Sequence, residues 1–241
     1  MTLFADKLHD TFGTWPLGYI PAGGADYGEV RAVATAIGDG DDGRYHAAWV
    51  AAATRLHDEA ETALVRGHVG SARDLLLRAS VFYGASLHPL YGAPVDPRLL
   101  AAARQQRTAF ARALALGRHP IAPLRIPFEA FELPACFIPA RGHETETRPL
   151  IILTNGYDAT IPDLYFAAAV AASRRGYHSL LFDGPGQTCS RPAPARSSTR
   201  CAARKRCCAS PQPKARASTA RCRTARWSIA ARWTGWMSSS A

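Results

Sequence analysis

The chain has 241 residues, enough for one large domain or two small ones with a sizeable buried core. Its 29 lysines and arginines exceed its 19 acidic residues by ten, an excess that favours nucleic-acid or membrane-surface partners. The excess is unevenly spread. Residues 1–187 carry 17 basic and 19 acidic side chains, a net charge of −2, whereas residues 188–241 carry 12 basic side chains, no acid and five of the six cysteines. The average charge therefore describes neither part.

Several classes of protein are excluded by the sequence. No apolar run approaches the roughly 18 residues that a membrane span needs, so we expect no membrane partner. The N-terminal segment 1–7 has an acid where a signal peptide needs a long apolar region. One cysteine in residues 1–187 fits a reducing compartment. These features predict a cytoplasmic protein.

The first half of the chain predicts helices. Residues 45–66 repeat apolar side chains at spacings of three and four, as in an amphipathic helix, and Gly67 suits its C-terminal cap. A second helix is expected to begin near Ser71, where Asp74 three residues later resembles a capping box. A third is expected over 96–117, because Asp-Pro at its start is an N-cap followed by proline at the first helical position. A simple helical bundle is the alternative interpretation of this half.

The middle of the chain changes to strand patterns. Residues 124–128 and 131–138 predict a hairpin that turns at Glu129-Ala130, and the prolines in both segments favour edge strands. The continuous apolar run 149–154 predicts a strand covered on both faces. We expect later strands to flank this run in a complete sheet, so its exposed flank in this chain predicts low solubility.

A βαβ unit follows from the next segments. The strand 149–154 leads to a helix at 162–175 and to a second apolar strand at 178–182, which implies a parallel pair with a right-handed crossover. Ligands of such sheets bind beyond the carboxyl ends of the strands. The segments 155–158 and 183–187 are both expected at that edge.

The sequence resembles the α/β-hydrolases grouped with 2,6-dihydropseudooxynicotine hydrolase and related esterase and acyl-peptidase-like proteins. The resemblance spans roughly residues 10–187, and residues 71–83 look like the cap helix of that group. The motifs that carry it are Asn155-Gly-Tyr-Asp-Ala-Thr160, Tyr165-Phe166, Arg174-Arg-Gly-Tyr177 and Leu181-Phe-Asp-Gly-Pro-Gly-Gln187.

The resemblance implies an α/β fold in three parts. Residues 1–120 are expected to form an N-terminal helical cap, and residues 121–187 the first part of an α/β-hydrolase parallel sheet. Residues 188–241 contain Ile229 as their only Val, Ile, Leu or Phe, which is too little apolar surface for a core. We therefore expect a disordered basic tail there.

The resemblance also implies a chemistry. The family hydrolyses small acyl, ester or activated carbon–carbon substrates with a serine on a G-x-S-x-G elbow, a histidine and an acid, and it needs no cofactor. A small molecule is therefore the expected partner of the parent enzyme. The loop after the first buried strand is the expected oxyanion side of the site, although a plain strand-to-helix turn would use the same residues. That loop comprises Asn155, Gly156, Tyr157 and Asp158.

Two further groups of residues are candidates for the site. The turn at the sheet edge comprises Asp183, Gly184, Pro185, Gly186 and Gln187, with Asp183 as a structural cap of the turn and not a triad member. A substrate pocket between cap and sheet is expected from the family, with ordinary core packing as the alternative role of its residues. These are Phe82, Tyr83, His88 and Tyr91.

The sequence departs from the family after Gln187. It contains no G-x-S-x-G, so no catalytic nucleophile, histidine or acid is identifiable, and we expect the chain to be catalytically inactive. A reading-frame shift near residue 188 explains the change of composition. Back-translation of residues 226–241 with GC-rich codons, begun at the third base, gives V-V-D-R-R-P-V-D-R-V-D-V-V-V-G, a valine-rich strand followed by glycine. Sequencing the gene tests this hypothesis.

A second hypothesis is a non-catalytic helical binding module with a basic nucleic-acid-binding tail. Ten arginines and Trp227, Trp233 and Trp236 could contact phosphates and stack on bases, although we expect no specific nucleic acid. The tail cysteines lack the spacing of a zinc site, and no metal is expected. The segment Gly38–Gly43 formally fits G-x-G-x-x-G, but its acids favour a loop that caps the first long helix. The oligomeric state is left open.

Overall fold

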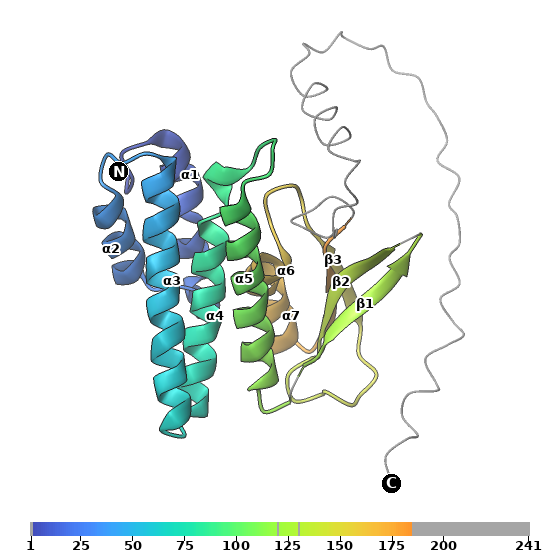
Figure 1. The fold of residues 1–241 in the computed structure, drawn as a ribbon. Helices are drawn as coiled ribbons and strands as arrows, with labels where there is room; N and C mark the ends of the chain where they lie inside the picture. Colours follow the sequence, from blue (N-terminus) through green and yellow to red (C-terminus); the bar gives the residue numbers. More distant parts are fainter. Residues whose placement is uncertain (1, 120, 130, 185–241) are drawn as a thin grey trace, which may run out of the picture.

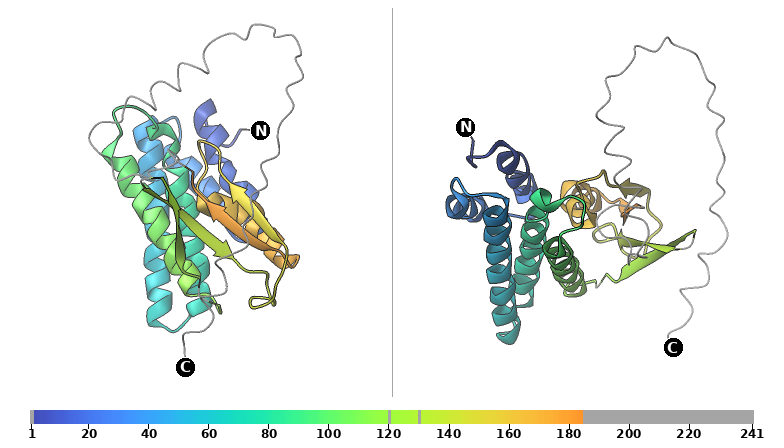
Figure 2. Two further views of the ribbon diagram at one scale, coloured as in Figure 1. Left: turned by 90° about the vertical axis from the view of Figure 1, so that its right-hand side faces the viewer. Right: turned by 45° about the horizontal axis from the view of Figure 1, so that its top comes forward.

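The computed structural model describes residues 2–119, 121–129 and 131–184. Helices and a sheet form separate layers (Figure 1), and the right-hand view of Figure 2 shows the same separation. The helical segments before the sheet are α1 Lys7–Gly13, η1 Trp15–Ala22, α2 Tyr27–Ile37, α3 Asp42–Val65, α4 Val69–Ala85, η2 His88–Leu90 and α5 Pro97–Ala115. The three long helices expected from the sequence are confirmed as α3, α4 and α5.

Two helix starts agree with the sequence pattern. Asp41 caps α3, since its carboxylate accepts a hydrogen bond from the backbone amide of Arg44 at 2.9 Å. The acidic loop expected before the first long helix is thereby confirmed. Asp96 caps α5 in the same way, at 2.8 Å from the amide of Arg98.

The start of α4 differs from the prediction. The helix begins at Val69, and its N-cap His68 makes no side-chain capping bond. Ser71 lies inside the helix, so the capping box expected there is wrong. The reason is the tight turn before it: Gly67 adopts a left-handed backbone with φ of 76°, and the amide of His68 bonds to the carbonyl of Ala63 at 2.8 Å. This turn ends α3 and reverses the chain within three residues, so α4 begins directly after it at Val69.

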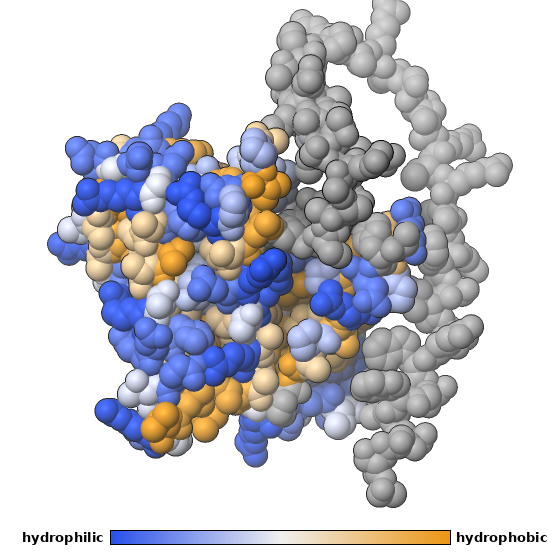
Figure 3. All heavy atoms as spheres, in the orientation of Figure 1, coloured by the Kyte–Doolittle hydropathy of each residue, from blue (hydrophilic) through white to orange (hydrophobic). Residues whose placement is uncertain are grey.

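The core of the helical layer lies between α3 and α4. Trp49 of α3 is fully buried, and its ring meets that of Phe82 of α4 edge-on, with centroids 5.0 Å apart. Gly84 of α4 lets the Gln106 side chain of α5 approach its backbone closely. Figure 3 shows hydrophilic side chains over much of the visible face of the helical layer, with apolar patches between them.

The described strands form a four-stranded mixed sheet. They are β1 Pro123–Phe128, β2 Phe131–Ile138, β3 Leu150–Thr154 and β4 His178–Phe182, in the spatial order β1-β2-β4-β3. The hairpin is confirmed, because β1 pairs antiparallel with β2 from Pro123↔Cys136 to Phe128↔Phe131. The parallel pair is also confirmed, with Leu150 of β3 opposite His178 of β4.

Two strand predictions are wrong. The strand β2 is not an edge strand, because it lies between β1 and β4. Its Pro134 lacks an amide but still serves the sheet: its carbonyl accepts from the amide of Asp183 at 3.1 Å, and the pairing with β4 runs through the residues after it. The strand β3 is not covered on both faces among the described residues, since Leu150 and Ile152 are 49% and 58% exposed. Among the described strands β3 has β4 as its neighbour on one side only, as the expected exposed flank requires, and the low solubility expected from that flank stays a prediction.

The helix between β3 and β4 has an irregular turn. It comprises α6 Ile161–Leu164, a π-helical turn η3 Tyr165–Ala169 and α7 Val170–Arg174, close to the predicted range. Thr160 caps it in a capping box with Asp163. Gly176, with φ of 83°, reverses the chain into β4. The helix lies between the sheet and the earlier helices, so it joins the two layers (Figure 1).

Candidate functional site

The carboxyl ends of β3 and β4 lie side by side, and each is followed by a polar side chain. Asn155 follows β3 and Asp183 follows β4. The side-chain amide of Asn155 donates a hydrogen bond to Oδ1 of Asp183. Parallel strands bring such residues together because their carboxyl ends share one edge of the sheet. The two sequence-predicted loops therefore meet in the fold.

Asp183 is a buried carboxyl, with 5% of its surface exposed. Burial is the main reason that its pKa is raised from 3.8 to about 7. The hydrogen bond from Asn155 opposes that rise, and the carboxylate of Asp163 adds to it. Gly184 is also buried, whereas Pro185, Gly186 and Gln187 lie outside the described residues. The role of Asp183 as a cap of that turn stays a prediction.

The loop after β3 contacts the helical layer through aromatic rings. Tyr157 is 55% exposed, and its ring centroid lies 5.8 Å from that of Tyr91, which follows η2. The ring of Tyr91 in turn lies 6.1 Å from that of His88. Gly156 is exposed beside Tyr157, and Asp158 is partly buried. Two of the four predicted pocket residues are thus brought to the predicted oxyanion-side loop.

His88 is enclosed by aromatic side chains from the first residues of the chain. Phe12 stacks on its ring with centroids 4.3 Å apart, and Trp15 approaches edge-on at 5.0 Å. Its Nδ1 lies 3.2 Å from the carbonyl oxygen of Ala85. Desolvation by this enclosure is the main reason that the pKa of His88 is lowered. The imidazole is therefore held in its neutral form at neutral pH.

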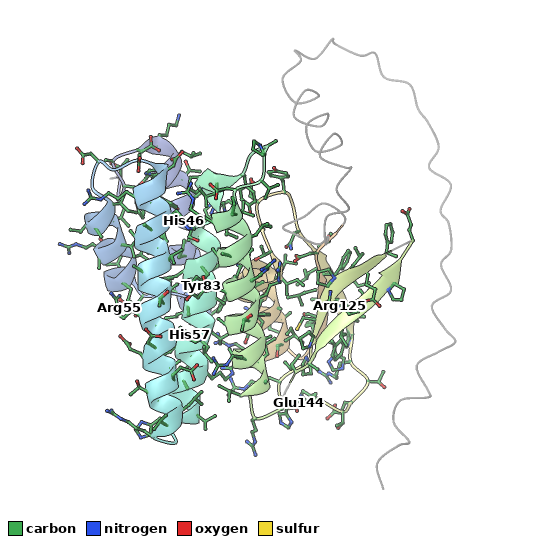
Figure 4. All side chains as sticks on the ribbon, in the orientation of Figure 1. His46, Arg55, His57, Tyr83, Arg125 and Glu144 are labelled. Carbon is green, nitrogen blue, oxygen red and sulfur yellow. The ribbon has the colours of Figure 1, made fainter. Side chains whose placement is uncertain are left out.

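The other two predicted pocket residues lie away from the loop. Phe82 packs against Trp49 in the helical core. The hydroxyl of Tyr83 is 3.1 Å from Oγ1 of Thr54 on α3. In Figure 4 the labelled Tyr83 lies within the helical layer, apart from the sheet. Their positions match the core-packing alternative that the sequence left open.

A network of hydrogen-bonded polar side chains holds the end of the loop that follows β3. Gln106 of α5 donates to Oγ1 of Thr160 at 3.0 Å, and that hydroxyl donates to Oδ2 of Asp163 at 2.7 Å. The hydroxyl of Tyr19 in η1 donates to the other carboxylate oxygen of Asp163 at 3.0 Å. Gln106 and Thr160 are both buried, so each depends on these partners.

Some residues around the site were not predicted from the sequence. For Thr160 and Asp163 a signal exists, because Thr160-x-x-Asp163 is the capping pattern of a helix start. Phe12, Trp15 and Tyr19 lie in α1 and in the proline-containing η1, segments too short and irregular to show a helical period. No spacing rule connects them to residues more than 70 positions later.

The described residues set limits on other kinds of site. Among them, no three metal-ligating side chains gather in one place. No helix in the described ranges combines the length and apolar character that crossing a membrane requires. The predictions about residues 188–241, including the tail that could bind nucleic acid and the shifted frame, lie outside the described residues.

Comparison with known proteins identifies relatives of this arrangement, although no family model matches the chain. Hydrolase acrC of Aspergillus aculeatus is 37% identical over an alignment of 180 residues, and the match covers 69% of this chain and 42% of the relative. Alpha/beta hydrolase ucsC of an Acremonium species is 31% identical over an alignment of 183 residues, and the match covers 71% of this chain and 37% of the relative. This chain thus spans about two fifths of the length of these relatives.

A solved structure shares the fold. The crystal structure of 2,6-dihydroxy-pseudo-oxynicotine hydrolase superimposes with a TM-score of 0.59 at 22% identity. The match covers 71% of this chain and 46% of that one. The resemblance noted from the Asn155 and Leu181 motifs is therefore confirmed at the level of the fold.

Proposed function

Because this chain is an α/β-hydrolase-like protein over the part that it shares with its relatives, we propose that it carries the cap and the oxyanion side of a serine-hydrolase site. The parent enzyme would act on a small acyl, ester or activated carbon–carbon substrate. In this division residues 1–120 form the cap and residues 121–187 belong to the hydrolase sheet. By itself the chain has no triad-dependent activity.

The observation that carries this proposal is the meeting of three segments at one sheet edge. The Asn155 loop after β3 hydrogen-bonds to Asp183 after β4, and its Tyr157 contacts Tyr91 from the helical layer. A substrate held against this edge would touch both the sheet and the cap. Ligands of parallel sheets bind at such an edge.

The roles follow from the chemistry of acyl transfer. A tetrahedral intermediate needs amide donors for its negative oxygen, and the backbone amides of Gly156 and Tyr157 are our candidates. Asp183 holds the loop through Asn155 and is assigned no triad role. Tyr91 and His88 form the aromatic wall on the cap side. The nucleophile is absent from the 241 residues, which contain no G-x-S-x-G.

A direct assay tests the lack of triad chemistry. The purified full chain is incubated with 4-nitrophenyl acetate and butyrate, with and without a serine-directed fluorophosphonate. We expect hydrolysis that rises linearly with substrate and is unchanged by the inhibitor. Saturable turnover that the fluorophosphonate abolishes would contradict the proposal.

A second experiment tests the oxyanion assignment. The gene is resequenced around codon 188, and where a single-base change restores a hydrolase frame, the restored protein is assayed as Tyr157→Pro and Tyr157→Ala variants. Both lose the ring, but only the proline variant loses the amide. We expect kcat of the proline variant to be lower by about 10²- to 10³-fold. Equal kcat values would exclude the Tyr157 amide as a donor.

The alternative function, a binding module with a nucleic-acid-binding tail, predicts a different result. Its 12 basic side chains after residue 187 would give binding to single-stranded DNA that weakens steeply with salt and survives removal of residues 1–187. Binding in the same assay that is independent of salt, or that requires residues 1–187, would exclude this alternative.

A further inference from the structure

A second concave surface lies at the opposite end of the molecule from the candidate site. This groove has a volume of about 1120 Å³ and lies between the helical layer and the sheet. Its walls come from the segment between η1 and α2, the first half of α4, the end of α5 and the segment after it, the end of β2 and the segment after it, and from η3 and α7. Since β2 runs antiparallel to β4, the segment after β2 lies at the end of the sheet away from Asn155 and Asp183. Glu144 of this segment is labelled in Figure 4.

The groove gathers positive charge in a part of the chain that is otherwise slightly acidic. Five arginines and three acids line it, so their difference is +2 with its single histidine neutral. Residues 1–187 as a whole carry −2. The arginines are Arg73, Arg78, Arg118, Arg141 and Arg174, and the acids are Asp26, Asp74 and Glu144.

The acids of the groove are already engaged. Asp26 caps α2 by accepting from backbone amides at its start. Glu144 accepts from the amide of Gly142 at 2.9 Å and lies 3.7 Å from Nε2 of His119. Asp74 pairs with Arg73 at 3.3 Å. These acids are therefore largely engaged, and the groove arginine Arg78 is itself neutralised by Glu29, 2.6 Å away.

Two of the arginine side chains have no protein acceptor in the part of the chain that the structure describes. The side chains of Arg118 and Arg141 are exposed, and among the described residues neither makes a hydrogen bond or an ion pair. Arg73 turns inward and donates to the hydroxyl of Tyr165 at 3.2 Å. Arg174 donates to the backbone carbonyl of Pro21 at 3.3 Å. The groove thus offers a rim of guanidinium groups of which two lack a protein acceptor.

The lining between these charges is apolar. Leu77 of α4, Leu114 of α5 and Ile138 of β2 are each at least nine-tenths buried and still border the groove. Val170 of α7 adds a further aliphatic side chain. A ligand in this groove would therefore meet both hydrocarbon and guanidinium groups.

We propose that this groove binds a small amphiphilic anion, a molecule with a phosphate or carboxylate head and an aliphatic body. The head would pair with Arg118 and Arg141, which prefer planar or tetrahedral oxyanions that accept more than one hydrogen bond. The body would cover the partly buried Leu116, Ile121 and Val170 side chains, which also border the groove, and remove their apolar surface from water. The site is separate from the hydrolase site, so its occupancy does not depend on the proposed function.

Calorimetric titration of the full chain with dodecyl phosphate below its micellar concentration tests the proposal. We expect saturable binding at one site. The variant Arg118→Glu/Arg141→Glu is expected to bind at least about tenfold more weakly, because two favourable ion pairs become repulsions. The matched control is Arg31→Glu/Arg104→Glu, which reverses two exposed arginines outside the groove and is expected to bind as the parent chain does. Circular dichroism confirms that both variants are folded.

Three further probes identify the ligand class. Inorganic phosphate and dodecyl maltoside each keep only one half of the amphiphile, and both are expected to bind at least about tenfold more weakly than dodecyl phosphate. Equal binding of either would overturn the amphiphile assignment. A decaglutamate peptide that bound more tightly than dodecyl phosphate would also overturn it, in favour of an acidic peptide. Equal losses in the groove variant and the control variant would show that the groove is not the site.

Discussion

At the scale of single residues, the candidate site depends on a carboxyl whose ionisation is disfavoured. Burial raises the pKa of Asp183 to about 7, so the folded chain holds a proton that an unfolded chain would release near pH 4. The folded state therefore binds more protons between these two values. By linkage, its free energy of unfolding falls as the pH rises from about 4 to about 7, and the loss is complete above that window.

The variant Asp183→Asn tests this dependence. Asparagine keeps the shape and an acceptor for the Asn155 amide, but it has no proton to lose. We expect the variant to gain stability relative to the parent chain as the pH rises from 4.5 to 7.5, by up to a few kcal/mol. Urea unfolding of both proteins across this range measures the difference. A difference that stays constant with pH would show that Asp183 does not titrate there.

Thr160 is the second residue on which the candidate site depends, because its hydroxyl joins two polar side chains. Thr160→Val keeps the side-chain shape but leaves Gln106 and Asp163 without the hydroxyl that joins them. We expect a loss of about 1–3 kcal/mol in the free energy of unfolding. Thr35→Val is the control, because its exposed hydroxyl bonds only to the carbonyl of Arg31, and it is expected to change stability by less than about 0.5 kcal/mol. Equal effects would argue against the buried network.

At the scale of elements, the helical layer depends on the close approach of α4 and α5. A Cβ atom at Gly84 would collide with the amide group of Gln106, whereas one at Gly70 near the start of α4 would meet no atom within 4 Å. The same substitution therefore has opposite consequences in one helix. Interhelical packing decides the first case, and backbone entropy of the unfolded chain decides the second.

The variants Gly84→Ala and Gly70→Ala measure that contrast. We expect Gly84→Ala to lower the free energy of unfolding by about 1–3 kcal/mol, since Gln106 must move and lose its bond to Thr160. Gly70→Ala is expected to raise it by about 0.4–1 kcal/mol. Thermal and urea unfolding report both values. Stabilisation by Gly84→Ala would show that α5 is packed less closely than the structure indicates.

The elements also show how far sequence reasoning reaches. Local rules located α5, because Asp96-Pro97 is both a cap and a start, and they located the β1–β2 hairpin. They failed for β2, whose place beside β4 is decided by pairing between segments 40 residues apart. In the site, the sheet edge and the Asn155 loop were predictable from the βαβ pattern. The contacts of Phe12 and Trp15 with His88 were not, since only tertiary packing brings these segments together.

At the scale of the whole molecule, the outer edge of β3 is the least protected feature. Among the described strands its only neighbour is β4, and it carries no charge or proline that would discourage further pairing. Its Ile152 is 58% exposed. An uncharged, apolar edge of this kind recruits strands from other molecules.

A lysine at this edge should reduce self-association. We expect Ile152→Lys to raise the concentration at which the chain begins to associate, as measured by light scattering. Val65→Lys is the matched control, because Val65 is 90% exposed at the end of α3 and lies on no strand. It is expected to leave the onset unchanged. An equal gain from both variants would indicate that added charge, and not the strand edge, governs solubility.

The strand order β1-β2-β4-β3 has a consequence for the timing of folding. The long helices follow one another in the chain, α3 and α4 through a short turn and α4 and α5 through residues 86–96, so they can pack while the chain is still being synthesised. The sheet cannot close in that order. β2 and β3 follow one another in the chain, yet β4 stands between them, so β3 has no partner until residue 182 has left the ribosome. During that interval the nascent chain depends on its helices and on the β1–β2 hairpin.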